Sequence, residues 1–271
     1  SHMQKIGLLA GVGRLPVEFA RAARGMGFAV TAIAVVPGTD SELPLVADQL
    51  YTISAGELEK IITTLQQEGI SEVTMIGKVT KELLFAGAVA LDDRMKKLLS
   101  MLPNQNDDTI MLAIVREMDQ AGIGVLDQTA LIRQLLPAPG VLTDRQPTPQ
   151  EQADIEYGFQ MAKAIGRLDI GQTVVVKDKA IMAVEAIEGT DECIKRGGLL
   201  GRGGVTVAKT AKPSQDIRFD MPAVGPATLQ AMITAGATAL VMEAGRTLLV
   251  DKAAVLALAK ENNITIVAMV E

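Results

Sequence analysis

A polar segment in the second half of the chain carries the residues most able to do chemistry. It reads KTAKPSQDIRFDMPAVGP over residues 209–226, and turn-forming residues run through it. Lysine and arginine bind phosphate oxygens, whereas aspartate binds hard divalent cations or acts as a general base. We therefore expect a phosphate site here, although a salt-bridged surface loop would have the same composition. The candidates for phosphate binding are Lys209, Lys212, Gln215 and Arg218, and those for metal ligand or general base are Asp216 and Asp220.

A second polar motif, EGTD at residues 188–191, lies about twenty residues upstream. Glu188 and Asp191 can share one cation if the segment turns, and their oxygen atoms suit Mg²⁺. Thr190 joins the candidates for substrate binding. The alternative is structural, because Thr190-Asp191 could equally cap a helix over DECIKR.

The N-terminal AGVGRLP places Gly11 and Gly13 at a strand-to-helix turn. Glycines there let the backbone approach a nucleotide or phosphate, with the helix amides pointing at the anion. Gly77 and Lys78 end a later strand at the same sheet edge, where Lys78 could reach a phosphate. Pro16 replaces the third glycine of the dinucleotide motif, and no acidic residue closes the second strand, so we expect no nicotinamide or flavin site. A tight structural turn is the alternative.

Composition narrows the chemistry further. The only histidine is His2, in a Ser1-His2-Met3 stretch that we interpret as a cleavage scar, and Cys193 is the only cysteine. This excludes catalytic triads, histidine-ligated zinc and thiolate clusters. Mg²⁺, or alternatively Mn²⁺, is therefore the expected cofactor. A net charge of −6 and 3% aromatic residues argue against a nucleic-acid partner.

The first half of the chain alternates apolar runs with helical patterns, which indicates a parallel sheet covered on both faces. We expect a Rossmann-like domain over residues 4–136. Its predicted strands are 6–11, 29–36, 50–53, 72–77 and 124–127, and its predicted helices are 15–27, 56–69, 92–102 and 107–122.

Four prolines mark residues 137–149 as a linker. The remaining residues, 150–271, are predicted to form the catalytic domain, an α/β domain with a mixed sheet. A helix is expected over 148–166 with Thr148 as its N-cap, followed by a hairpin within 173–189 that turns at Asp178-Lys179. Further strands are predicted at 204–209, 239–244, 247–250 and 264–270, and helices at 227–236 and 252–263.

Four stretches of the chain match a known family. EAIEGTD (185–191), KPSQDIRFDMPAVGP (212–226), LDIGQTVVV (168–176) and GLLAGVGRLP (7–16) resemble the UDP-2,3-diacylglucosamine pyrophosphatases of the LpxI type. The resemblance runs from residue 5 to the C-terminus. It implies two domains, the first Rossmann-like, with the lipid substrate held between them. It also implies a Mg²⁺-dependent hydrolase of lipid A synthesis that forms UMP and 2,3-diacylglucosamine 1-phosphate, with Asp220, before Met-Pro in FDMP, as the catalytic aspartate.

The partners follow from this resemblance and from composition. The substrate is expected to be an acylated nucleotide-sugar. The chain has no apolar run of about 18 residues and no signal peptide, so we expect a cytoplasmic protein in transient contact with the inner face of the membrane. A homo-oligomer is left open.

Two other classes of function compete with the hydrolase. One is a nucleotide-sugar or dinucleotide-binding protein that uses the AGVG turn, with the polar segment as a regulatory or transferase site. The other is a non-hydrolytic carrier of lipid or nucleotide, in which the polar segment only forms salt bridges. Release of UMP in the presence of Mg²⁺ separates the hydrolase from a carrier.

Overall fold

The computed structural model describes residues 4–77, 79, 89–127, 133–213 and 221–271. These residues form two compact units, one from the described residues up to Arg133 and the other from those starting at Gln134. Both units are α/β, as predicted, and each is described by itself below.

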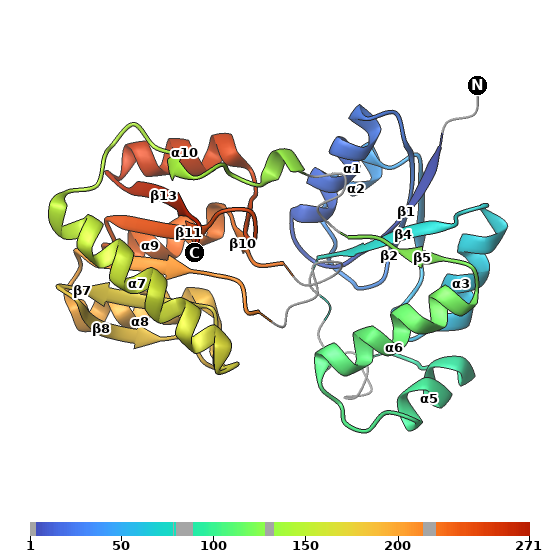
Figure 1. Ribbon diagram of the computed structural model, residues 1–271. Coiled ribbons are helices and arrows are strands. Elements are labelled where there is room, and N and C mark those ends of the chain that lie inside the picture. The colour runs from blue at the N-terminus through green and yellow to red at the C-terminus, as the bar shows by residue number, and fades with distance from the viewer. Residues whose placement is uncertain (1–3, 78, 80–88, 128–132, 214–220) are drawn as a thin grey trace. The chain divides into compact units, whose positions relative to one another are not determined.

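The first unit is built on a five-stranded parallel sheet with the order β3-β2-β1-β4-β5 (Figure 1). Apolar residues fill its central strands because helices cover both faces, which confirms the predicted Rossmann-like sheet. The strands are β1 (Lys5–Ala10), β2 (Ala29–Ala34), β3 (Gln49–Thr52), β4 (Glu72–Ile76) and β5 (Gly124–Val125).

The helices of the first unit follow the predicted ranges closely. Asp92 caps α5 by accepting a hydrogen bond from the Met95 amide at 2.8 Å, and Asp107 and Asp108 place negative charge in the first turn of α6. The single-turn α2 was not predicted, because four residues are too few to show a helical period. The described helices are α1 (Leu15–Gly25), α2 (Leu43–Val46), α3 (Leu58–Gln67), α5 (Asp93–Ser100) and α6 (Asp107–Gln120).

The second unit contains the predicted mixed sheet, with the order β6-β13-β11-β9-β7-β8. β9, β11 and β13 are parallel, whereas β6, β7 and β8 pair antiparallel with their neighbours. A separate two-stranded parallel sheet joins β10 to β12. The strands are β6 (Gly140–Val141), β7 (Thr173–Lys177), β8 (Ala180–Val184), β9 (Thr206–Lys209), β10 (Ala223–Val224), β11 (Ala239–Glu243), β12 (Leu248–Leu249) and β13 (Thr265–Met269).

The β7–β8 hairpin turns at Asp178 and Lys179, as predicted. Both residues have positive φ, at 51° and 57°, which is the backbone conformation of a tight hairpin turn. Neither is glycine, and the carboxylate of Asp154, on the helix α7 (Pro149–Arg167), compensates by accepting hydrogen bonds from both of their amides, at 3.0 and 2.8 Å. The turn is therefore tied to the helix that covers it.

Helices cover both faces of the second sheet. α7 (Pro149–Arg167) packs Ile155, Phe159 and Ala162 on one face, whereas α8 (Thr190–Gly201), α9 (Pro226–Ala235) and α10 (Lys252–Glu261) cover the other. α7 starts with the predicted Thr148 cap, which forms a reciprocal capping box with Glu151. None of the helices in the described part of the chain has the length and apolarity needed to cross a membrane.

Part of the proline-rich stretch lies along the second sheet. β6 pairs with β13, and the Thr143 hydroxyl accepts a hydrogen bond from the Ile266 amide at 3.2 Å. Arg145 binds the Thr265 hydroxyl and pairs with Glu151 at 3.0 Å. Within the second unit, residues 140–145 are thus held to β13 by hydrogen bonds.

Candidate active site

Polar side chains gather at one edge of the second sheet. Lys209 and Glu243 are the last residues of the parallel strands β9 and β11. Because β7 is antiparallel to β9, its first residue, Thr173, pairs with Lys209. Glu185 follows β8 at the same edge, with its amide bonded to the Thr173 carbonyl oxygen at 2.9 Å. Ligands of open α/β sheets bind beyond the carboxyl ends of the parallel strands, which makes this edge the candidate site.

Glu185 is a buried carboxylate that was not among the predicted residues, and only 7% of its surface is exposed. The Thr190 hydroxyl donates a hydrogen bond to Glu185 Oε1 at 2.7 Å and lies 3.3 Å from the Thr173 hydroxyl. Thr190 is therefore held at the sheet edge by a carboxylate. An acidic residue directly after the apolar strand 180–184 was the signal in the sequence that could have identified Glu185.

Lys209, a predicted phosphate ligand, is buried at the same edge. Its Nζ donates a hydrogen bond to the Ala223 carbonyl oxygen at 2.8 Å, and 8% of the residue is exposed. Burial lowers the pKa of Lys209, and the negative charges of Glu185 and Asp191 oppose that shift. The ammonium therefore ties β9 to the start of β10 and brings positive charge to an edge that also carries carboxylates.

The N-terminus of α8 lies next to this cluster. A helix does begin at the EGTD motif, but Gly189, with φ of 88°, occupies the N-cap and Thr190 is the first helical residue. The capping interpretation of Thr190 is therefore wrong, since its hydroxyl binds Glu185 instead of a helix amide. Asp191 is exposed in the first turn, where a carboxylate is favoured by the helix dipole.

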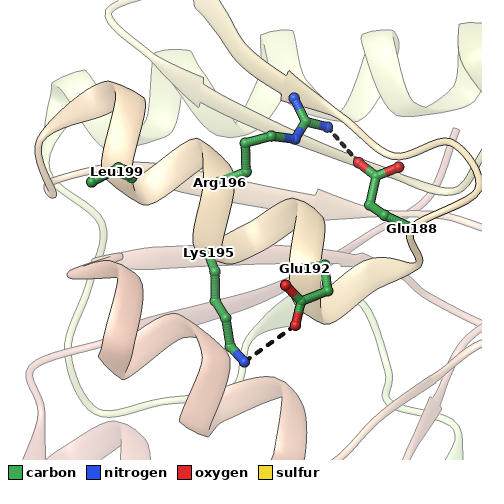
Figure 2. Close-up of a pocket in the computed structure, with 5 residues that line it drawn as sticks. All are labelled: Glu188, Glu192, Lys195, Arg196 and Leu199. Atoms are coloured by element: carbon green, nitrogen blue, oxygen red, sulfur yellow. Dashed lines mark hydrogen bonds and ion pairs between the residues drawn. The ribbon is translucent and has the colours of Figure 1, made fainter.

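Glu188, a predicted metal ligand, is engaged by other groups. It forms an ion pair with Arg196 on α8 (Figure 2). Its second oxygen accepts a hydrogen bond from the Ala186 amide at 3.0 Å. The hydrogen bond from Arg196 is the main cause that lowers the pKa of Glu188. Glu188 and Arg196 line a shallow surface pocket together with Leu199 and a second ion pair, Glu192 with Lys195 at 3.4 Å. Its four charges thus form two ion pairs, one within α8 and one between α8 and the turn that precedes it.

The remaining charged and amide residues of the predicted set divide into two groups. Lys212 pairs with the exposed Asp169 at 3.0 Å and belongs to the same unit as the sheet edge. The others, Lys78, Gln215, Asp216, Arg218 and Asp220, lie outside the residues that the structure describes. Their roles stay predictions.

The glycine turn of the first unit also lies at a sheet edge. The Gly11 amide donates to the Ile76 carbonyl oxygen at 2.8 Å, and Gly77 follows at once with φ of 96°. A Cβ on Gly77 would lie 2.8 Å from the Gly11 carbonyl carbon, so the two turns are in contact there. Gly13 has φ of 113°, which favours glycine. The structure thus brings Gly11 and Gly77 into contact, with Gly13 two residues further along the first turn, and a role in ligand binding stays a prediction.

Arg14 was missed by the sequence analysis. It follows Gly13 at the start of α1 and forms ion pairs with Glu42 at 2.6 Å, Asp40 at 3.6 Å and Glu18 at 3.5 Å. The carboxylates after β2 thus bind an arginine of the neighbouring turn. Such a pairing between residues 28 positions apart is not visible in a local pattern.

The described residues do not by themselves form a metal site. Among them, no group of three or more histidine, cysteine, aspartate or glutamate side chains is arranged to hold a metal ion. Glu188 is already bonded to Arg196, and the predicted ligand Asp216 is outside the described ranges.

Comparison with known families identifies the chain. The LpxI N-terminal domain matches residues 5–135, and the LpxI C-terminal domain matches residues 138–267. The chain belongs to the LpxI family. The polar sheet edge with Glu185, Thr190 and Lys209 lies wholly within the part that matches the C-terminal LpxI domain.

A curated relative supports the same assignment. The chain is 35% identical to the UDP-2,3-diacylglucosamine pyrophosphatase LpxI of Caulobacter vibrioides, over 96% of this chain and 95% of that protein. The LpxI match therefore spans both units.

Two solved structures are distant likenesses of this chain. The biotin carboxylase subunit of pyruvate carboxylase matches with a TM-score of 0.28 and 14% identity, over 69% of this chain and 39% of that one. UDP-glucose-4-epimerase from Stenotrophomonas maltophila matches with a TM-score of 0.28 and 14% identity, over 45% of this chain and 35% of that one. This chain thus spans well under half of either structure, and neither likeness bears on its function.

Proposed function

We propose that this chain is a UDP-2,3-diacylglucosamine pyrophosphatase of lipid A biosynthesis. The observation that carries the proposal is its 35% identity, over 96% of the chain, to a protein named for that activity. The reaction adds water across the pyrophosphate. The water oxygen bonds to one phosphorus, the bridging oxygen leaves with the other, and the products are UMP and 2,3-diacylglucosamine 1-phosphate.

The sheet edge offers suitable groups for an anionic substrate. The buried ammonium of Lys209 and the N-terminus of α8 both bring positive charge to it. Lys212, on the segment that leads away from β9, adds a second, partly exposed cation. We propose that these groups favour binding of the pyrophosphate and that Asp220 is the catalytic carboxylate.

We also propose that the activity depends on Mg²⁺, with Mn²⁺ as a substitute. Glu188, Asp191 and Asp216 are the proposed ligands, because oxygen donors select hard cations. The pairing of Glu188 with Arg196 means that this carboxylate would have to exchange its partner to bind a metal. The acyl chains of the substrate lead us to propose in addition a transient contact with the inner face of the membrane.

Incubation of the purified protein with UDP-2,3-diacylglucosamine and Mg²⁺ tests the proposal. We expect equal amounts of UMP and 2,3-diacylglucosamine 1-phosphate, resolved by mass spectrometry. Tight binding of the intact substrate with no UMP formed would instead support the alternative, a non-hydrolytic nucleotide-sugar or lipid binding protein.

A further inference from the structure

The second unit contains a buried ion pair that the proposed function has not used. Lys163 on α7 places its Nζ 2.8 Å from Glu243 Oε2 at the end of β11, and the two side chains are 3% and 5% exposed. Burying two charges is costly, and apolar residues in their place are often equally stable or more so. Stability alone therefore does not explain the pair.

Glu243 uses its second oxygen to hold backbone. Its Oε1 accepts the amide hydrogen of Ala211 at 2.9 Å. Ala211 is 2% exposed and lies two residues beyond the end of β9. Glu243 is thus bonded on one side to the Lys163 ammonium and on the other to the chain that leaves β9.

The turn that follows Glu243 contacts the same segment again. Arg246 donates from Nη2 to the Lys212 carbonyl oxygen at 3.3 Å. The turn itself is closed on Glu243, whose carbonyl oxygen accepts both the hydroxyl and the amide of Thr247. Residues 243–247 therefore hold two successive residues, Ala211 and Lys212.

The strand after this turn holds the chain on the other side of residues 214–220. The Leu248 amide donates to the Pro222 carbonyl oxygen at 3.0 Å, and the Val250 amide donates to that of Val224 at 2.9 Å. We name residues 243–250 the platform, because this one stretch binds backbone both before residue 214 and after residue 220. Residues 214–220 carry Asp220 and lie outside the described residues.

We propose that Glu243, held by Lys163, is a positioning residue for the pyrophosphatase reaction. It acts by fixing the backbone at Ala211, which sets where the chain enters the segment that carries Asp220. The inference rests on the proposed function. The positioning role requires the Glu243 oxygen that accepts the Ala211 amide, and the ion pair with Lys163 keeps that oxygen in place.

Two double variants separate positioning from stability. Lys163→Met with Glu243→Gln removes both charges but keeps an oxygen able to accept the Ala211 amide. Lys163→Met with Glu243→Leu removes the charges and the acceptor, and replaces the pair with apolar side chains of similar size. We expect both proteins to fold. The Gln variant should keep kcat within about threefold of the unmodified chain, whereas the Leu variant should lose about tenfold or more in kcat with little change in KM.

Hydrogen exchange provides a readout that does not depend on activity. Peptides that cover Ala211 and Lys212 should exchange faster in the Leu variant than in the Gln variant, while peptides from α7 stay protected in both. Equal kcat values in the two folded variants, or equal exchange at Ala211, would overturn the positioning role.

A third variant keeps the test decisive if the Leu variant does not fold. Arg246→Ala removes the contact with Lys212 from a partly exposed site, and Arg116→Ala on α6 is the matched control in the other unit. We expect kcat to fall severalfold in Arg246→Ala and to stay unchanged in Arg116→Ala. An unchanged kcat in both variants would contradict the positioning role proposed for the platform. If the unmodified chain makes no UMP, the proposed function fails, and the exchange comparison still decides whether Glu243 holds Ala211.

Discussion

The buried ammonium of Lys209 donates a hydrogen bond to the carbonyl oxygen of Ala223, 2.8 Å away. The bond joins the end of β9 to the start of β10, across residues 214–220 in the sequence. Lysine is costly to bury as a cation, and burial is the main reason that its pKa is lowered. Lys209 therefore connects two strands at the candidate site and is also a source of positive charge there.

This environment gives Lys209 a defined effect on stability against pH. An unfolded lysine titrates near 10.5, whereas the buried one releases its proton at lower pH. Between these two values the unfolded chain binds more protons than the folded one, so the contribution of Lys209 to stability rises with pH. Lys209→Met, which keeps most of the apolar stem, provides the reference without a titrating group.

We expect the free energy of unfolding of the unmodified chain, minus that of Lys209→Met, to increase with pH up to 10.5. Urea denaturation at a series of pH values measures this difference, and Lys260→Met on the exposed face of α10 is the matched control for replacing a lysine by methionine. A difference that falls with pH would mean that the fold stabilises the ammonium relative to water.

The contact between the two glycine turns of the first unit predicts unequal costs for two similar substitutions. Gly69 and Gly77 both have positive φ, but only a Cβ on Gly77 would meet backbone, 2.8 Å from Gly11. We expect Gly69→Ala to cost about 1 kcal/mol through backbone strain and Gly77→Ala to cost about 2–4 kcal/mol through strain and displacement of the turn. Denaturation with urea measures both, and equal costs would show that the two turns can move apart freely.

Cys193 should be inert in the folded protein. Its side chain, in the first turn of α8, is fully buried, and burial raises the pKa of the thiol to about 12. Because the thiolate is the reactive form, alkylation by iodoacetamide at pH 8 should be at least about a hundredfold slower in the native protein than in urea. The chain has one cysteine, so the mass change reports on this site alone. Rapid alkylation of the native protein would show that α8 opens readily from the sheet.

The metal prediction is tested by removal and replacement. Exhaustive treatment with EDTA should abolish UMP formation, and Mg²⁺ or Mn²⁺ should restore it whereas Zn²⁺ should not, because the proposed ligands are all oxygen donors. Full turnover in EDTA would exclude a required divalent metal. If Mg²⁺ does restore activity, Glu188, Asp191 and Asp216 can be substituted one at a time. The substitution that abolishes the response to Mg²⁺ identifies a metal ligand.

Much of the fold could be predicted because its signals are local. Thr148 with Pro149 marked the start of α7, and apolar runs on either side of Asp178-Lys179 marked the hairpin. The twelve-residue helix α8 was anticipated only as the alternative interpretation of Thr190-Asp191. The other elements that were missed are too short to show a period. α2 has four residues, and β6 and β10 have two each. Such elements form because a neighbouring strand or helix provides their partners, and no pattern in the sequence encodes that.

The candidate site was predictable only in part, for a related reason. Thr190 and Lys209 stood in conspicuous polar motifs, and the structure places both at one sheet edge. Glu243 was missed because its partner Lys163 is 80 positions away and its other bond is to backbone. Pairing over that distance depends on the order of strands in the sheet, which a single sequence does not reveal.

The central claim, hydrolysis that depends on Asp220, is tested most directly by one comparison. UMP release from UDP-2,3-diacylglucosamine is measured for the unmodified chain and for Asp220→Asn, which preserves the shape of the side chain and removes its charge. We expect the unmodified chain to form UMP, and the variant to bind the substrate with similar affinity while losing about a hundredfold or more in turnover. Near-normal turnover in a folded Asp220→Asn protein, or no UMP from the unmodified chain, would contradict the account.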